Sequence, residues 1–121
     1  MQMQQRKLGN EYEEKICRYL EGQGMTILDR NYTIRGGEID IIAVDGDYIC
    51  FVEVKFRSNR AIDAYSSVGF RKQSRIIRTA HRYLYETGSQ LQPRFDVAFV
   101  FTEDGEDAIE YMKNAYDASR G

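Results

Sequence analysis

The chain of 121 residues has the length of about one domain, and its 42% hydrophobic and 12% aromatic residues exclude a disordered chain. The net charge of −2 alone argues against a nucleic-acid-binding protein, but the charges are unevenly placed. Residues 55–82 hold eight basic residues and one acid, which is typical of a surface that binds a polyanion. A solvated helix face is the alternative interpretation.

No apolar run approaches the roughly 18 residues of a membrane span, and the N-terminus MQMQQRKLGN lacks the hydrophobic stretch of a signal peptide. Cys17 and Cys50 stand alone, which favours reduced thiols over a disulfide framework. We therefore expect a cytoplasmic protein with no membrane partner, organised as one domain over residues 1–121. The single His81 excludes a histidine-rich metal site, so any metal would need oxygen ligands.

A first helix is expected over residues 10–23, with Asn10 as its N-cap and Gly22 and Gly24 marking its end. One sector of this helix is apolar and contains Tyr12, Ile16, Tyr19 and Leu20, with Cys17 at its flank. Glu13 also lies in that sector. It is therefore the acidic residue of this helix that we expect to point toward the protein.

Three strands are expected next, over residues 25–32, 37–44 and 48–56. The second and third form a hairpin around Asp45-Gly46-Asp47, a strong turn signal. Alternation places Glu38, Asp40, Ile42 and Val44 on one face of the second strand, and Phe51, Glu53, Lys55 and Arg57 on one face of the third. A loop of two or four residues would set Asp40 beside Glu53 on the same face, whereas three residues would set them on opposite faces.

A long helix is expected over residues 68–87, with Ile76, Ile77, Ala80, Tyr83 and Leu84 as its apolar stripe. Its arginines fall together on the opposite side: Arg71, Arg75, Arg78 and Arg82. A strand over residues 94–101 follows, in which Asp96 would support the sheet or a neighbouring subunit rather than bind a ligand. A short final strand and a helical turn are expected over residues 107–118. This order predicts an α/β fold with a mixed sheet of four to five strands, flanked by the N-terminal helix and the long central helix.

Glu53 and Lys55 are charged residues within an apolar strand. Each charged side chain would lose hydration when buried there, at a cost of several kcal/mol unless another interaction compensates it. A surface pair on an edge strand is one interpretation. In the other, Asp40 and Glu53 converge from adjacent strands and repel unless a divalent cation neutralises them. With the Val54 carbonyl they offer the oxygen ligands that suit Mg²⁺ or Mn²⁺. Lys55 would then orient or deprotonate the attacking water or stabilise the transition state, and Glu13 would assist at the metal.

Asp40 and Glu53-Val54-Lys55, preceded by a helical glutamate, resemble the core of PD-(D/E)XK nucleases. Over residues 9–117 the chain more closely resembles the YraN-like family of small bacterial proteins, through YLEGQGMTIL, GGEIDIIA, FVEVKFR and RFDVAFV. That family is similar in pattern to archaeal-type Holliday junction resolvases. Ile39 stands where the nucleases have a proline, which shapes the strand but binds no metal.

The resemblance implies a restriction-endonuclease-like core and a Mg²⁺- or Mn²⁺-dependent endonuclease acting on DNA, in which Asp40, Glu53 and Lys55 are catalytic and Glu13 is auxiliary. Branched recombination or repair intermediates are candidate substrates, and symmetric cutting of a four-way junction would require a homodimer. Nucleic-acid contacts are expected from Arg57, Arg71, Lys72, Arg75, Arg78 and Arg82. The alternatives are a nucleic-acid-binding module that does not cleave and a protein-interaction scaffold with the same fold.

Overall fold

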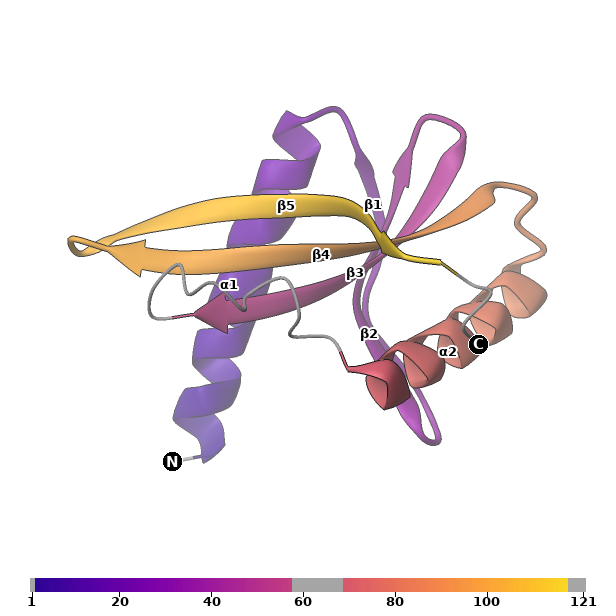
Figure 1. Ribbon diagram of the computed structural model, residues 1–121, viewed down its shortest axis with the longest axis horizontal. Helices are drawn as coiled ribbons and strands as arrows, with labels where there is room; N and C mark the ends of the chain where they lie inside the picture. The colour runs from indigo at the N-terminus through magenta and orange to yellow at the C-terminus, as the bar shows by residue number, and fades with distance from the viewer. Residues whose placement is uncertain (1, 58–68, 118–121) are drawn as a thin grey trace.

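The computed structural model describes the backbone of residues 2–57 and 69–117, and the side chains of residues 10–57 and 69–117. Within these ranges the chain forms helices and strands in alternating groups (Figure 1). They are α1 (Gln2–Gly22), β1 (Thr26–Ile34), β2 (Gly37–Asp45), β3 (Tyr48–Arg57), α2 (Phe70–Thr87), β4 (Gln92–Glu103) and β5 (Glu106–Tyr116). Neither helix is long and apolar enough, over its described residues, to cross a lipid bilayer.

The five strands form one mixed sheet in the order β1-β2-β3-β4-β5. Neighbouring strands run antiparallel, except that β3 and β4 are parallel. A parallel neighbour requires a crossover that returns the chain to the other end of the sheet, and α2 lies in that connection. The expected α/β fold with an N-terminal helix and a long central helix is confirmed.

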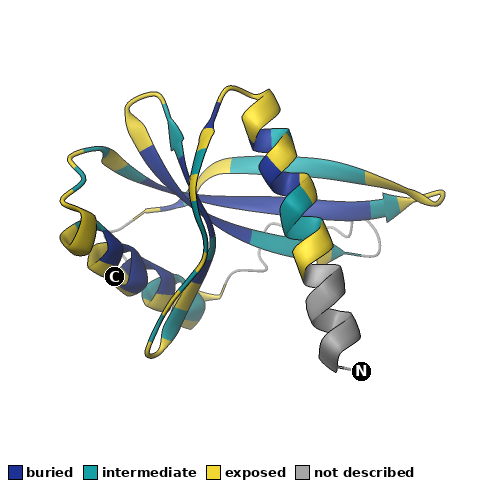
Figure 2. Ribbon diagram, turned by 180° about the vertical axis from the view of Figure 1, so that it is seen from behind, coloured by how far each residue is buried: buried dark blue, intermediate teal, exposed yellow. Residues whose placement is uncertain are grey.

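The two helices cover opposite faces of the sheet, because successive strand residues point to opposite sides. Ile41 and Val52 join the core cluster beneath α1, whereas Ile42 and Phe51 join the cluster beneath α2. The buried residues of α2 include Ile76, Ile77, Ala80 and Tyr83, as its apolar stripe predicts. In Figure 2 the buried residues of α2 lie on the side of the helix that faces the sheet.

The first helix begins earlier than the sequence suggested. Asn10 was expected to be its N-cap, but α1 starts at Gln2, so Asn10 lies inside the helix. The residues before Asn10 are mostly good helix formers such as Gln, Met, Lys and Leu, which explains why the helix continues through them. The expected end is confirmed, since α1 ends at Gly22 and Gly24 adopts a positive φ of 89°.

The end of the chain also differs from expectation. In place of a short strand and a helical turn, residues 106–116 form the 11-residue strand β5, which pairs with β4. The connecting turn Asp104-Gly105 has φ values of 51° and 79°, as a tight two-residue hairpin requires. This Asp-Gly pair is the turn signal that the sequence interpretation missed.

The start of β2 lies unusually close to α2. A Cβ atom added to Gly37 would lie 2.0 Å from Thr79 Oγ1 and 3.3 Å from the Arg75 carbonyl oxygen. Thr79 is buried, and its hydroxyl donates to that same carbonyl at 2.7 Å. Gly37 therefore sets the distance between the β1–β2 hairpin and α2.

We predict that Gly37→Ala lowers the free energy of unfolding by about 1 to 3 kcal/mol, because the added methyl group forces β2 away from α2. Urea unfolding followed by circular dichroism measures this change. Adding Thr79→Ala should recover part of the loss, since it removes the atom nearest to the new methyl group. Gly22→Ala is the control, because nothing lies within 4 Å of a Cβ at that position. An unchanged stability of Gly37→Ala would contradict the prediction.

Candidate functional site

The β2–β3 hairpin brings Asp40 and Glu53 together at one end of the sheet. The turn between the strands has two residues, Gly46-Asp47, which is one of the loop lengths expected to place the two carboxylates on one face. Backbone pairing runs up to the position just before them, so they are next in register. There the Val54 N–H donates to Asp40 Oδ2 at 2.8 Å, so that a carboxylate takes the place of a backbone acceptor.

Strand β2 changes faces at Asp40. Ile39 and Ile42 both belong to the cluster beneath α2, whereas Ile41 between them belongs to the cluster beneath α1. The regular alternation expected for this strand is therefore wrong around Asp40. In β1, Asn31 lies opposite Asp40 in the register and adopts a left-handed φ of 53°, which asparagine tolerates better than most residues.

Two lysines meet Glu53, whose side chain is only 8% exposed. Lys72 Nζ of α2 lies 2.5 Å from Glu53 Oε1, and Lys55 Nζ of β3 lies 3.5 Å from the same oxygen. Burial and the neighbouring Lys72 lower the pKa of Lys55. For Lys72, burial acts in the same direction, but the hydrogen bond to Glu53 outweighs it and raises the pKa. Lys72 is therefore the firmly charged partner of Glu53.

Asp40 is held in an environment that disfavours its charge. Burial, followed by the charge of Glu53, raises the pKa of Asp40 to about 7, and the Val54 N–H offsets only part of this effect. Glu13 and Glu38 add smaller contributions in the same direction. When Asp40 is ionised, above neutral pH, the site therefore holds a negative charge that the protein does not fully compensate.

Glu13 points toward this end of the sheet from α1, as its place in the apolar sector predicts, and its side chain is 13% exposed. Asn31 Nδ2 donates to Glu13 Oε1 at 3.0 Å, and an Arg30 nitrogen lies 3.9 Å from the same oxygen. Burial raises the pKa of Glu13, with smaller contributions from the charges of Glu38 and Glu53. The left-handed asparagine opposite Asp40 therefore also orients the glutamate of the helix.

A cavity of about 370 Å³ opens beside the carboxylates, between the β1–β2 turn and the first turns of α2. Glu38, Asp40 and Glu53 line it together with Lys72 and Arg75. Glu13 is not part of this lining. The sequence placed Glu38 on the same strand face as Asp40 but not among the candidate site residues, and its place in the cavity wall adds it to the site.

The donor set suits an open metal site rather than a closed cage. Within residues 10–57 and 69–117, no three His, Cys, Asp or Glu side chains form a group that could enclose a metal ion. Mg²⁺ is commonly held by one or two carboxylates, with waters and substrate phosphates as further ligands. Asp40 and Glu53 fit that pattern, because their charges repel each other and because Glu53 already attracts an ammonium group. The Val54 carbonyl stays an expected third ligand.

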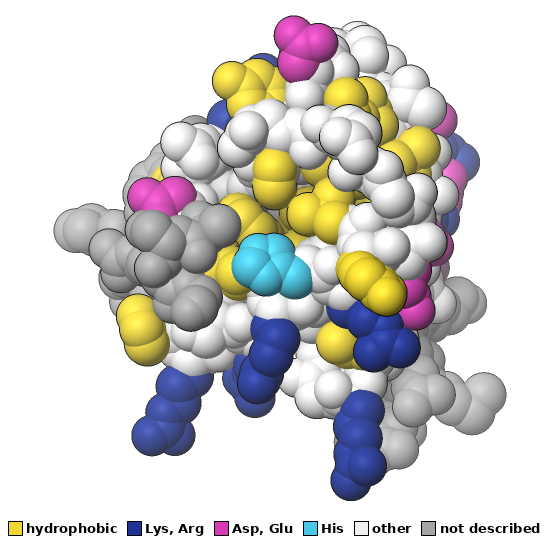
Figure 3. Space-filling view, turned by 90° about the vertical axis from the view of Figure 1, so that its right-hand side faces the viewer, with side chains coloured by type: hydrophobic (Ala, Val, Ile, Leu, Met, Phe, Trp, Pro, Cys, Tyr) yellow, Lys and Arg dark blue, Asp and Glu magenta, His cyan; other side chains and the backbone are white. Residues whose placement is uncertain are grey.

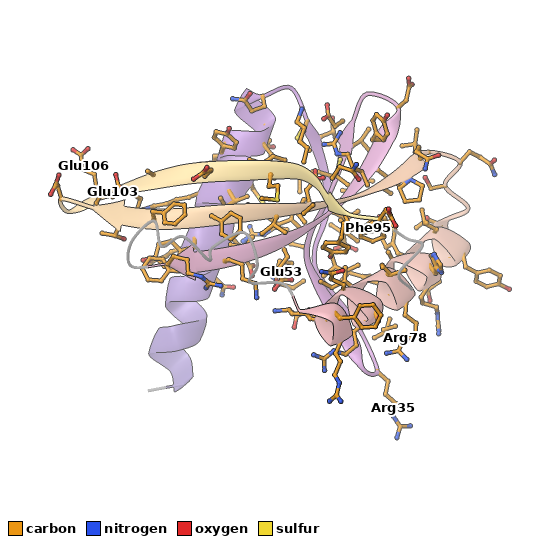
Figure 4. The ribbon with its side chains drawn as sticks, in the orientation of Figure 1. Arg35, Glu53, Arg78, Phe95, Glu103 and Glu106 are labelled. Carbon is orange, nitrogen blue, oxygen red and sulfur yellow. The ribbon has the colours of Figure 1, made fainter. Side chains whose placement is uncertain are left out.

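The arginines of α2 lie on its exposed side, opposite the buried stripe, and they are Arg71, Arg75, Arg78 and Arg82. Arg57, at the end of β3, is half-buried and donates to the Phe56 carbonyl oxygen at 2.9 Å. The exposed Arg35 in the β1–β2 turn was not among the expected residues. In Figure 4, Arg35 and Arg78 point to the same lower side of the molecule, and Figure 3 shows basic side chains projecting there.

Asp96 belongs to a buried network at a different place in the sheet. Its fully buried carboxylate accepts hydrogen bonds from Arg94, from the Tyr111 hydroxyl at 2.5 Å and from the Asn114 backbone N–H at 2.8 Å. The network ties β4 to β5, and the expectation that Asp96 supports the sheet is confirmed.

Comparisons with known proteins agree with the resemblance to the YraN-like family of small bacterial proteins. Residues 12–100 match the model of the uncharacterised protein family UPF0102. The chain is 39% identical over 117 residues to a UPF0102 protein of Myxococcus xanthus (strain DK1622), covering 95% of this chain and 93% of that protein. It is 42% identical over 117 residues to a UPF0102 protein of Chlorobium chlorochromatii (strain CaD3), covering 91% of each.

The raised pKa of Asp40 predicts that stability depends on pH in a definite direction. Its pKa is 3.8 in the unfolded chain and about 7 in the folded protein, so between these values the folded state binds the proton more tightly. This contribution to stability is present at low pH and is lost as pH rises toward 7. Asp40→Asn removes the charge while keeping an oxygen that can accept the Val54 N–H. The variant should be more stable than wild type at pH 8, by an amount on the order of 2 kcal/mol, and the advantage should vanish near pH 4.

Urea unfolding in EDTA at pH 8 and at pH 4 measures this difference. Glu21→Gln, which changes an exposed carboxylate of α1, is the control and should show no comparable dependence. If Asp40→Asn were less stable than wild type at pH 8, the account of Asp40 would be wrong.

Proposed function

The chain belongs to protein family UPF0102, and from that premise we propose that it is a metal-dependent nuclease that hydrolyses phosphodiester bonds of DNA. The main observation behind the proposal is that Asp40 and Glu53 lie together in the wall of a cavity. The cationic side chains of Lys72 and Arg75 line the same cavity. Carboxylates suited to a divalent cation and cations suited to a phosphate thus lie in one site. Metal-assisted phosphodiester hydrolysis uses this combination.

Asp40, Glu53 and the Val54 carbonyl would hold the cation, with Mg²⁺ or Mn²⁺ as the metals that such oxygen ligands prefer. When bound, the cation supplies positive charge for the phosphate and makes a water more acidic. It would also stabilise the ionised form of Asp40, which burial and the charge of Glu53 disfavour. Because a cation would stabilise the ionised Asp40, a divalent cation site explains Asp40 and Glu53 better than a pair of carboxylates that only supports the fold.

Lys55 is the residue that we assign to the attacking water. It lies on the same strand face as Glu53, 3.5 Å from that carboxylate, and burial lowers its pKa, the direction that proton transfer from the water requires. Lys72 would turn from Glu53 to the scissile phosphate when a metal is bound. Glu13, held by Asn31, would orient water at the edge of the site.

The resemblance to the PD-(D/E)XK nucleases supports the same assignment, because Asp40 and Glu53-Val54-Lys55 occupy the positions of that motif. DNA is the expected polymer, since α2 presents its exposed arginines beside the cavity. Branched recombination or repair intermediates are the proposed substrates. The homodimer and the cytoplasmic location stay predictions.

One observation favours a second candidate, a nucleic-acid-binding module that does not cleave. Lys72 and Lys55 already place two ammonium groups near Glu53, so the protein itself compensates this carboxylate. In that case the cavity would bind a phosphate without hydrolysing its ester. Asp40 argues against this candidate, because neither lysine forms an ion pair with it within the described residues.

A cleavage assay on labelled linear duplex, flap and four-way junction DNA tests the proposal. We predict cleavage with Mg²⁺ or Mn²⁺ and none with EDTA. Glu53→Gln should reduce the rate by about 100-fold or more, the scale expected for the loss of one preorganised charged group. Circular dichroism shows whether each variant is folded.

Glu106→Gln, in the exposed β4–β5 turn, is the matched control and should cleave like wild type. Cleavage that persists in EDTA, or equally in Glu53→Gln, would refute the assignment. DNA binding without cleavage in any metal would favour the second candidate.

A further inference from the structure

The exposed side of α2 carries a straight row of side chains. Arg71, Arg75, Arg78, Arg82 and Tyr85 follow one another at intervals of four, three, four and three residues. Because the helix has 3.6 residues per turn and rises 1.5 Å per residue, the arginines form one row about 16 Å long, and Tyr85 extends it by a further turn. All five side chains lie on the side of the helix that faces away from the sheet.

The row passes along the candidate site. Arg75 belongs to the row and also lines the cavity that contains Asp40 and Glu53. Lys72, which contacts Glu53, lies one turn before Arg75. Arg71 lies in the first turn of α2, and beyond Arg75 the row continues with Arg78 and Arg82 toward the C-terminal end of the helix. A strand with one phosphate in the cavity would therefore meet the remaining arginines in sequence.

The β1–β2 turn adds a second wall. Gly36 and Gly37 line the cavity opposite Arg75, and Gly37 touches Thr79 so closely that no Cβ would fit. The exposed Arg35 is thereby held beside the row, and Figures 3 and 4 show basic side chains on this side of the molecule. A polyanion lying along α2 would have positive charge on two sides.

The charges of the row are largely uncompensated. In the part of the chain that the structure describes, no acidic side chain forms an ion pair with Arg35, Arg71, Arg75 or Arg78, whereas Arg82 pairs with Glu86 at 3.1 Å. Guanidinium groups match phosphate oxygens in a two-pronged geometry. Guanidinium groups repeated at regular intervals fit the repeated phosphates of a nucleic-acid backbone. Such contacts do not depend on the base sequence.

Tyr85 distinguishes between kinds of nucleic acid. Its side chain is 87% exposed, although a large aromatic group gains nothing from full contact with water. Aromatic side chains next to basic grooves stack on unpaired bases, whereas the bases of an intact duplex are already stacked on one another. An aromatic ring at the end of a phosphate-binding row therefore favours a strand whose bases are accessible.

We propose that α2 binds an unpaired DNA strand, with its phosphates on Arg75, Arg78 and Arg82 and with one base stacked on Tyr85. The proposal rests on the proposed function in taking DNA as the polymer. It adds a substrate class: DNA with a single-stranded segment next to the site of cleavage, such as a flap or a branch. The contact does not depend on the base sequence, and it extends from the cavity along α2 toward the C-terminal end of the helix.

Fluorescence anisotropy in EDTA tests the proposal without cleavage, using a labelled single strand and a duplex of the same length. Tyr85→Ala should weaken binding to the single strand by about tenfold and leave binding to the duplex unchanged. Tyr85→Phe keeps the ring and should bind like wild type. Because the side chain is exposed, both variants are expected to fold.

The arginines are tested by the combined variant Arg75→Gln, Arg78→Gln and Arg82→Gln. It should lower the slope of log affinity against log salt concentration by about 2, at roughly 0.7 for each phosphate contact in a single strand. The charge-matched control Lys15→Gln, Arg18→Gln and Lys113→Gln removes three positive charges from exposed positions on α1 and β5, and should leave the slope nearly unchanged.

Equal losses on single strand and duplex for Tyr85→Ala, no loss at all, or equal changes of slope in the two triple variants would overturn the proposal. These results would leave the nuclease assignment unaffected, because that assignment is tested by cleavage in the presence of metal. Conversely, a protein that binds as described but never cleaves would refute the nuclease assignment and leave this proposal standing.

Discussion

The architecture of the site depends on one hydrogen bond, from the Val54 N–H to the Asp40 carboxylate. It places Asp40 beside Glu53 at the point where the backbone pairing of β2 with β3 ends. Burial, and after it the charge of Glu53, make the ionised form of Asp40 unfavourable and raise its pKa to about 7. Lys72 reaches Glu53 from α2 and offsets its charge, and Asn31 of β1, which has a left-handed φ, holds Glu13.

The position of α2 links the stability of the fold to the proposed chemistry. One side of the helix closes the core, and Gly37 determines how closely the β1–β2 hairpin approaches it. Between the two elements lies the cavity with its carboxylates. The opposite side of the helix is left for arginines and Tyr85. The same 18-residue helix can thus support the sheet, contribute Lys72 to the site and present a row of charges to solvent.

Much of this arrangement could be predicted from the sequence, because it depends on local periodicity. The hairpin with its Asp-Gly-Asp turn and the two sides of α2 follow from alternation and helical spacing. The break in alternation around Asp40 could not be predicted, since Ile39 and Ile42 both pack beneath α2, which local alternation does not indicate. The contact of Lys72 with Glu53 and the place of Arg35 beside α2 also escaped prediction, because both arise from packing between elements distant in sequence.

The central claim is that Asp40 and Glu53 are held together to bind a divalent cation. The most direct test is thermal unfolding at pH 8 with increasing Mn²⁺, compared between wild type and Asp40→Asn. A cation that binds only the folded state raises the midpoint temperature in proportion to the logarithm of its concentration once the site is saturated. The account predicts such a rise for wild type and little or none for Asp40→Asn. An equal rise in both proteins, or none in wild type at millimolar Mn²⁺, would contradict it.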